Sequence, residues 1–253
     1  MINIKVAVSD KLIPIAENEM EIMEAFKILD ELDCESVLKY GFDPMSLDIG
    51  SSLGFLPMAT QLNDNWVTLF KHHHRRCILK PEEFIINKKI IKLLKDYTIS
   101  INTDFEYCID MINKTYDDSW LYKDLVEAYR DIYYNDYKYN MKIHSFILKK
   151  GDKIVAGEIG YNIGKVYTSL TGYHTINNSG NIQLLATAMI LQIYDFKLWD
   201  LGMELPYKLN LGGRMVERDK FCEMFKIYCK EPGYLGIKSN MNVHNLVIGG
   251  IYK

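Results

Sequence analysis

The order of the predicted elements between residues 97 and 202 constrains the fold most strongly. Three strands are separated by short turns that each contain a glycine, a pattern typical of a β-meander. The predicted strands are 142–149, 153–161 and 165–170. Two helices at 103–113 and 123–134 precede them, and a long helix at 181–194 leads to one further strand that reaches Asp200. This order predicts an α+β fold in which a mixed sheet is flanked by helices.

The rest of the chain gives weaker patterns. We expect a strand at 2–8 and a helix at 17–32, whose apolar residues recur with helical spacing. Further predictions are a short helix at 36–40 that ends at Gly41, mostly loop at 42–61, strands at 77–79 and 97–101, and a short amphipathic helix at 87–95. Thr103, with Glu106 three residues on, resembles a capping box for the helix that follows. We place a boundary at residue 79, which gives a small N-terminal domain (1–79) and a larger domain (80–253).

Composition excludes several classes of protein. The chain has 253 residues, of which 48% are hydrophobic and 12% aromatic, so it can bury a sizeable core. It has no apolar run of about 20 residues and no signal-peptide pattern at the N-terminus, which predicts a cytoplasmic protein without a membrane segment. The five cysteines lack metal-ligand spacing, and we interpret them as reduced packing residues.

Charge is distributed unevenly along the chain. The net charge is −3, but residues 71–95 carry eight lysines and arginines against two glutamates, a local charge of +6. Such a basic island can attract a polyanion, and a solvated helix face is the equally weighted alternative. The candidate contacts for a nucleic acid are Arg75, Arg76, Lys88, Lys89 and Lys92. Consecutive histidines at 72–74 alternate sides of a strand, so we predict no metal site there.

A stretch near the end of the chain, residues 193–213, combines a short apolar run with an acid. Phe196, Leu198 and Trp199 lead to Asp200, and a proline and several glycines follow. This pattern predicts a buried strand that delivers a carboxylate to its C-terminal end, where open α/β sheets bind ligands. A capping role for Asp200 at a turn is the alternative.

Short blocks from residue 54 to about residue 225 resemble the leucyl/phenylalanyl-tRNA–protein transferase family in order and spacing. The blocks are GFLPM (54–58), RCIL (76–79), SWLY (119–122), EAY (127–129), IHSF (143–146), VAGEIGY (155–161), GKVYTSLTGY (164–173), WDLG (199–202) and LGGRMVERDKF (211–221). The resemblance implies a GNAT-like (acyl-CoA N-acyltransferase-type) sheet in the larger domain. It also implies an enzyme that moves an amino acid from aminoacyl-tRNA to the N-terminal amine of a protein, which marks that protein for degradation.

The resemblance assigns roles to individual residues. Asp200 matches an acid that binds or deprotonates the acceptor amine, as a general base or an anchor. Trp120 matches a tryptophan that faces the terminal adenosine of the tRNA, and His144 matches a position where a structural role is as well supported as a catalytic one. Three positions depart from the family pattern: Gly202 replaces the glutamine of Asp-x-Gln, Leu170 replaces a glutamate, and Met58 replaces a tryptophan. The resemblance makes all three candidate substrate-binding positions, together with Trp120 and His144.

Other side chains can stand in for the missing groups. Glu158 and Glu204 are candidate acids, although a solvated carboxylate is the more common situation for glutamate. Tyr167 and Tyr173 offer hydroxyls and rings to a substrate, and packing within the sheet is the alternative for both. Gly202 itself allows a close approach of the backbone to a ligand.

Three functions follow from these patterns. The first is aminoacyl transfer without a cofactor, by a monomer whose partners are aminoacyl-tRNA and the N-terminus of a protein or peptide. The second is an acyltransferase that uses acyl-CoA, which the loop at 174–181 disfavours because it has one glycine and no lysine or arginine to hold a pyrophosphate. The third is a non-catalytic protein that binds peptide N-termini or tRNA.

Overall fold

The computed structural model describes residues 5–8, 12–116 and 120–251, so residues 2–4 and Ser119 of the patterns above lie outside the described residues. The chain divides into two compact units. The first comprises Met1–His74 and Asp118–Lys142, and the second comprises Arg75–Asp117 and Ile143–Lys253. This division differs from the boundary at residue 79, because the change occurs at His74 and a later segment belongs with the N-terminal part. A separate function for each domain stays a prediction.

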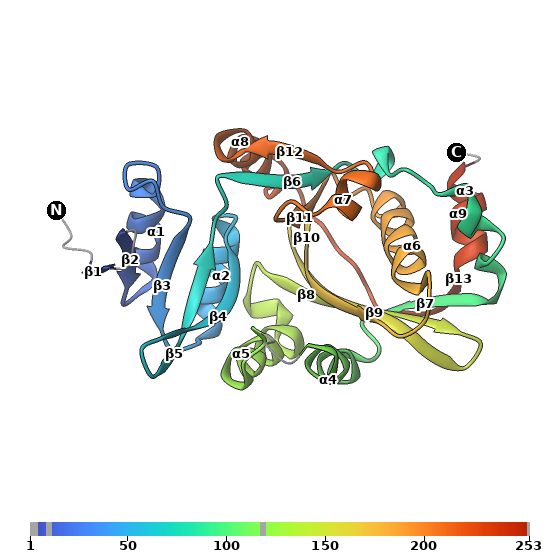
Figure 1. The fold of residues 1–253 in the computed structure, drawn as a ribbon, viewed down its shortest axis with the longest axis horizontal. Helices are drawn as coiled ribbons and strands as arrows, with labels where there is room; N and C mark the ends of the chain where they lie inside the picture. Colours follow the sequence, from blue (N-terminus) through green and yellow to red (C-terminus); the bar gives the residue numbers. More distant parts are fainter. Residues whose placement is uncertain (1–4, 9–11, 117–119, 252–253) are drawn as a thin grey trace. The chain divides into compact units, whose positions relative to one another are not determined.

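The first unit contains a sheet with the strand order β1-β2-β3-β5-β4 (Figure 1). Its strands are β1 Lys5–Val8, β2 Leu12–Ala16, β3 Ser36–Tyr40, β4 Leu56–Leu62 and β5 Asn65–Lys71. Its helices are α1 Glu19–Ile28, α2 Pro44–Ser52 and α5 Lys123–Tyr134. The helices predicted at 17–32 and 123–134 are confirmed by α1 and α5, which bury one apolar side each.

The predicted short helix at 36–40 is wrong, because these residues form β3. All five residues pair with β5 in antiparallel register, and Val37 and Leu38 are buried. Gly41 ends the strand at a φ of 78°, a left-handed conformation that glycine adopts without strain. A run of five residues is too short to show a helical period, and the partner residues lie 27 to 35 positions further along the chain. The local sequence pattern therefore could not distinguish a helix from a strand.

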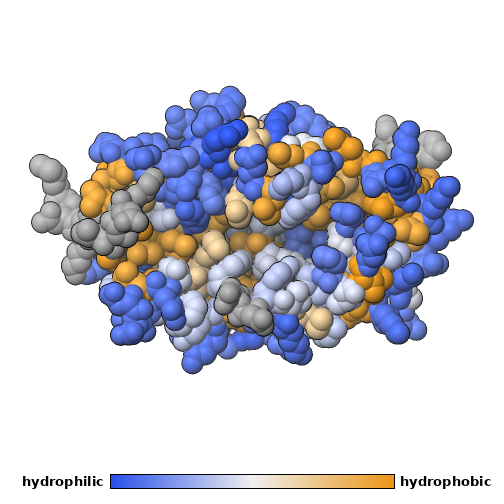
Figure 2. All heavy atoms as spheres, in the orientation of Figure 1, coloured by the Kyte–Doolittle hydropathy of each residue, from blue (hydrophilic) through white to orange (hydrophobic). Residues whose placement is uncertain are grey.

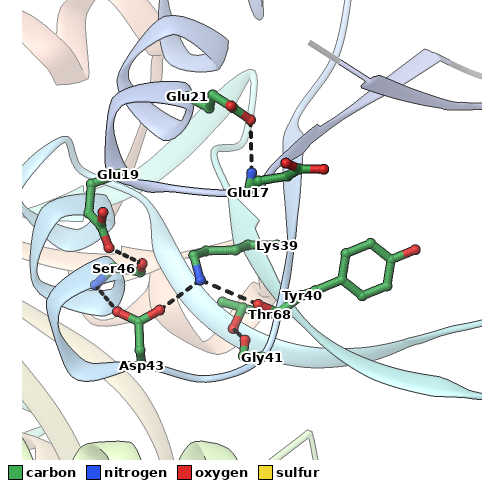
Figure 3. A network of polar contacts seen from close by, with 9 residues as sticks. All are labelled: Glu17, Glu19, Glu21, Lys39, Tyr40, Gly41, Asp43, Ser46 and Thr68. Carbon is green, nitrogen blue, oxygen red and sulfur yellow. Dashed lines mark hydrogen bonds and ion pairs between the residues drawn. The ribbon is translucent and has the colours of Figure 1, made fainter.

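The predicted loop at 42–61 is also wrong, because it contains α2 and β4. Asp43 caps α2 by accepting a hydrogen bond from the Ser46 N–H at 2.8 Å, and Pro44 occupies the first helical turn. Figure 3 shows that the Asp43 carboxylate also accepts from Lys39 Nζ at 2.7 Å. Burial alone would raise the pKa of Asp43, but the hydrogen bonds from Lys39 and Ser46 lower it. Pro57 is tolerated in β4 because this strand lies at an edge of the sheet.

The second unit contains a sheet whose described strands have the order β12-β6-β11-β10-β9-β8-β7-β13. The strands are β6 Arg75–Leu79, β7 Tyr97–Ile101, β8 Lys142–Lys150, β9 Lys153–Ile163, β10 Val166–His174, β11 Leu198–Gly202, β12 Arg214–Glu217 and β13 Lys238–Asn242. β10 and β11 run parallel, whereas β9 and β6 pair antiparallel with them. The mixed sheet flanked by helices is therefore confirmed, and the predicted β-meander corresponds to β8, β9 and β10.

Helices cover both faces of this sheet. α6 Ser179–Ile193 packs on β9 and β10, and α9 Val243–Ile251 packs against α6, β7 and β13. α4 Phe105–Thr115 and α8 Arg218–Tyr228 pack on the other face. The long helix predicted at 181–194 is confirmed by α6. The predicted capping box is wrong, because Asp104 is the N-cap residue of α4 and the Thr103 hydroxyl donates to the Asp104 carboxylate instead.

Hydrophilic residues cover much of the face shown in Figure 2, with apolar atoms visible between them. Among the helices in the described part of the chain, none has the length and apolar composition needed to cross a membrane.

Asp48 of α2 provides a test of why the segment 118–142 belongs to the first unit. Its buried carboxylate accepts hydrogen bonds from the Met141 N–H at 2.6 Å and from Asn140 Nδ2 at 3.3 Å. Replacing Asp48 by Ala leaves the buried Met141 N–H without this acceptor, so the free energy of unfolding should fall by about 1–3 kcal/mol. Urea denaturation measures the loss. Asp48→Asn, which keeps an acceptor, should lose less, and Asp64→Ala on the surface should change little; equal losses would contradict the assignment.

Candidate active site

Two neighbouring strands of the second unit separate at the level of Asp200. The parallel strands β10 and β11 pair only from Val166 to Thr168 and from Leu198 to Asp200. Beyond this point β10 follows β9 and β11 follows β6, and both of these pairs have a register shift, after Ser169 and after Asp200 respectively. Such bulges reorient side chains and interrupt strand pairing, and they are common beside active sites. The point of separation is therefore the candidate site.

Asp200 lies at this point in a network that uses both of its oxygens. Oδ1 accepts a hydrogen bond from the Gly202 N–H at 2.9 Å, and Oδ2 lies 3.3 Å from Arg76 Nη1 and 3.4 Å from Thr168 Oγ1. Asp200 is 1% exposed and Arg76 is fully buried, with the guanidinium 4.6 Å from the centre of the Phe221 ring. A carboxylate so enclosed aligns the backbone around it and does not lie open to a substrate.

Gly202 has a φ of 74°, in the left-handed region. A residue with a side chain would be strained there, so this backbone conformation favours the glycine that stands at this position. The Gly202 N–H is directed to Asp200, which makes this glycine part of the Asp200 network. Gly202 is itself buried.

Glu158 of β9 forms a second network of buried polar groups. Its Oε1 accepts from the Tyr167 hydroxyl at 2.8 Å and from the Ser169 hydroxyl at 2.7 Å, and its Oε2 accepts from Gln183 Nε2 at 3.0 Å. Burial raises the pKa of the Glu158 carboxyl, although these three donors act in the opposite direction. Burial also raises the pKa of Tyr167, and the negative charge of Glu158 adds to that effect.

The two acidic networks lie on opposite faces of the sheet. Thr168 and Ser169 are adjacent on β10, so their side chains leave opposite faces, and Thr168 contacts Asp200 while Ser169 contacts Glu158. The Asp200 face is covered by α8, which supplies Phe221, and the Glu158 face by α6, which supplies Gln183. The two predicted acids, Asp200 and Glu158, therefore do not face the same pocket.

Sequence reasoning missed Lys208, which lies on the short helix α7 Pro206–Asn210. Its ammonium group is buried and donates to the Leu201 carbonyl oxygen at 2.5 Å and to the Met203 carbonyl oxygen at 3.0 Å. These bonds fix the backbone on both sides of Gly202. Burial lowers the pKa of Lys208, and the nearby carboxylates oppose that effect. The proline at 206 signals a helix start, but no local pattern indicates that the lysine folds back over the preceding strand.

The remaining candidates on the second unit divide into buried and exposed groups. Tyr173 is buried on β10, and burial raises its pKa. His144 is buried and its Nε2 lies 2.6 Å from Asn162 Oδ1, which fits a structural role. Leu170 is half-buried at the bulge of β10. Glu204 is 52% exposed and lies 4.0 Å from Arg75, outside both acidic networks.

Met58 and Trp120 belong to the first unit. Ala59, which follows Met58 in β4, donates its N–H to the Trp120 carbonyl oxygen at 3.3 Å, so the two predicted substrate contacts lie on neighbouring segments. Tyr129 of α5 also donates its hydroxyl to the Pro57 carbonyl oxygen at 2.6 Å. These hydrogen bonds hold β4 against the segment that leads into α5.

The basic island does not form one surface helix. Lys88 and Lys89 lie on the short helix α3 Lys88–Ile91, and a separate 3-10 turn (η2) covers Leu94–Asp96, so the predicted helix at 87–95 is interrupted. Lys88, Lys89 and Lys92 are exposed, as is Arg75, which forms an ion pair with Glu217. The predicted contact of Arg76 with nucleic acid is wrong in this structure, because alternation along β6 turns its side chain inward to Asp200.

No group of three or more His, Cys, Asp and Glu side chains among the described residues is arranged to hold a metal ion.

Neighbouring arginines allow a direct test of the buried ion pair. Arg76→Met leaves the Asp200 carboxylate buried without its cation, so the free energy of unfolding should fall by about 3–5 kcal/mol. Arg75→Met removes an exposed cation and should cost less than about 1 kcal/mol. Chemical denaturation measures both, and the double variant Arg76→Met with Asp200→Leu should recover part of the loss. Equal effects at the two arginines would show that the pair is not the stabilising element.

Comparisons with known proteins agree with the sequence patterns. The family model of the leucyl/phenylalanyl-tRNA protein transferase matches residues 78–226. A leucyl/phenylalanyl-tRNA–protein transferase of Legionella pneumophila (strain Corby) is 27% identical over 169 residues, which cover 64% of this chain and 72% of the relative.

Two solved structures show lower similarity. FemX has a TM-score of 0.44 at 10% identity, with 84% of this chain and 80% of that chain covered. A GCN5-related N-acetyltransferase from Anabaena variabilis ATCC 29413 has a TM-score of 0.36 at 10% identity, with 82% and 53% covered. The family model spans more than half of the chain, including the last two residues of β6, all of β7 to β12, and most of α8. The chain belongs to the leucyl/phenylalanyl-tRNA protein transferase family.

Proposed function

We propose that this protein transfers an amino acid of the leucine or phenylalanine type from aminoacyl-tRNA to the N-terminal amine of a protein. The family match over residues 78–226 carries the proposal, because these residues form nearly all of the elements around the separated strands. The acceptor is then a protein marked for degradation through its N-terminus, in an N-degron pathway. We further propose that the protein works as a monomer in the cytoplasm without a cofactor.

The reaction needs few chemical groups from the protein. The aminoacyl ester is already activated, so the nitrogen of a neutral amine attacks the carbonyl carbon, the carbon–oxygen bond to the ribose breaks, and the ribose oxygen receives a proton. Holding the ester and the amine together supplies a large part of the rate enhancement. Removal of the proton from the attacking nitrogen supplies a further part.

We assign Asp200 a positioning role in this reaction. Its hydrogen bond to the Gly202 N–H and its ion pair with Arg76 support a role in fixing the backbone at the point where the strands separate. A direct role as general base is less well supported, because the carboxylate is almost fully buried and both oxygens are engaged. Asp200 is therefore proposed as a positioning residue.

We propose that Gly202, Leu170 and Met58, which differ from the family pattern, alter the specificity for substrates. All three positions are among those that the family resemblance assigns to substrate contact, and two of them lie at the bulges of β10 and β11. We expect the preferred amino acid or acceptor N-terminus to differ from that of the family pattern, while the type of reaction is kept.

A transfer assay tests the proposed function. Radiolabelled leucine or phenylalanine should move from charged tRNA to a peptide with a free N-terminus and not to an N-acetylated one. Asp200→Asn should lower the rate about 100-fold, the loss expected when reacting groups are misplaced by about 1 Å. The assay is run across a panel of charged tRNAs and N-terminal residues. The proposal fails if no charged tRNA is a donor, and saturable binding of acetyl-CoA would then favour an acyl-CoA donor.

The basic island gives a prediction about tRNA binding. Reversing the charge of the exposed Lys88 and Lys92 should weaken binding to uncharged tRNA. The slope of the logarithm of the binding constant against the logarithm of the salt concentration should become shallower by about one for each lost phosphate contact. Filter binding between 50 and 200 mM salt measures both quantities. The control reverses Lys226 and Lys230, which are exposed and have the same spacing at the end of α8. If both pairs have the same effect, residues 88–92 are not part of the tRNA contact.

A further inference from the structure

The network around Glu158 buries a carboxylate among neutral groups, which lowers the stability of the fold. A carboxylate that is 3% exposed has lost most of its hydration, and its hydrogen-bond partners are the neutral groups Tyr167, Ser169 and Gln183. In the described part of the chain, Glu158 takes part in no ion pair, unlike Asp200. Buried ionisable groups with shifted pKa values are concentrated at functional sites.

Ser169 is the one donor of the three that is not buried. Tyr167 is fully buried and Gln183 is 4% exposed, whereas Ser169 is half-buried at the bulge where β10 and β11 separate. A proton can therefore enter or leave Glu158 most directly through the Ser169 hydroxyl. The same hydroxyl lies next to Thr168, the last residue of β10 that pairs with β11.

The orientation of the Ser169 hydroxyl is set by its neighbours. Trp199 Nε1 can only donate, and it lies 2.8 Å from Ser169 Oγ. Ser169 Oγ thus accepts from Trp199 and directs its own proton to Glu158, 2.7 Å away. A hydroxyl oxygen has two lone pairs, and in the described residues Trp199 is the one donor to it. The second lone pair remains for an incoming donor.

We propose that Ser169 and Glu158 form a proton relay that accepts the proton of the attacking amine. As the nitrogen–carbon bond forms, the amine proton passes to Ser169 Oγ, and the hydroxyl proton of Ser169 passes to Glu158 Oε1. When the ester bond breaks, the same two steps run in reverse and deliver the proton to the ribose oxygen, so the relay returns to its first state. This inference rests on the proposed aminoacyl transfer.

The surroundings of Glu158 suit this role. Burial raises the pKa of the Glu158 carboxyl above its ordinary value, which favours uptake of a proton. The titratable groups whose pKa the charge of Glu158 raises are Tyr167 of β10, Cys108 of α4, and Tyr207 and Lys208 of α7, while Gln183 of α6 is neutral. Lys208 is the cation of this set, and its charge opposes the rise in the pKa of Glu158.

Matched substitutions at Ser169 separate the hydroxyl from the shape of the side chain. Ser169→Val and Ser169→Thr both introduce a β-branched residue that strands accept, but threonine alone keeps the hydroxyl. Transfer from charged tRNA to a peptide is measured with the full chain. Ser169→Val should lower kcat about 100-fold with KM for both substrates unchanged, and Ser169→Thr should stay within a few-fold of the unaltered protein. Thr98→Val, on the distant strand β7, controls for loss of a strand hydroxyl.

The dependence of kcat/KM on pH provides a second readout. At acid pH the rate requires a deprotonated peptide amine and an ionised Glu158, so the slope of log kcat/KM against pH should approach two. Glu158→Gln removes one of these ionisations, and the slope should fall to one together with the rate. An unchanged slope in Glu158→Gln, or equal rates for Ser169→Val and Ser169→Thr, would overturn the relay.

Infrared spectroscopy separates a failure of the relay from a failure of the proposed function. The protonated carboxyl of Glu158 should give a carbonyl stretching band that appears as pH falls, at a higher pH than for exposed carboxyls, and that is missing in Glu158→Gln. If the unaltered protein transfers amino acids and Ser169→Val transfers them at the same rate, the relay alone is wrong. If no charged tRNA is a donor, both proposals fail, whether or not the band appears.

Discussion

The second unit depends on an ion pair that is buried away from water. Arg76 and Asp200 are both buried in the sheet, and each is tolerable there because the other neutralises it. Their pairing requires β6 and β11 to stay in register up to Asp200, where the register then shifts. Lys208 adds a second buried cation that ties down the backbone beyond the shift. The geometry at the separated strands thus depends on buried charges, and replacing one member of the pair would leave the other without its counter-ion.

Local sequence patterns correctly predicted the helices and strands that are defined by their own residues. The helix at Lys123–Tyr134 and the strand at Tyr97–Ile101 have the predicted bounds, because periodic apolar residues define both. The meander of β8, β9 and β10 followed from glycine-containing turns. The family pattern identified Asp200 and Gly202 as a unit, and the structure shows the hydrogen bond that links them.

Features that depend on distant partners escaped prediction. β3 has no period of its own and is a strand because β5 pairs along its full length. Arg76 was counted with a basic surface, although a strand that starts at Arg75 turns neighbouring arginines to opposite sides. Lys208 and Ser169 gained their importance from hydrogen bonds to β11 and β9, which no spacing along the sequence encodes. In each case the deciding interaction lies between segments far apart in the chain.

The placement of Asp200 and Glu158 on opposite faces has a consequence for their electrostatics. Two carboxylates in one pocket repel each other, so they titrate as a coupled pair and share one proton over a wide pH range. Here the sheet stands between them as a partition, and Asp200 is not among the groups that shift the pKa of Glu158. The shift in the pKa of Glu158 therefore comes from its own burial, its three hydrogen-bond donors and Lys208, and the chemistry on one face of the sheet is electrostatically separate from the ion pair on the other.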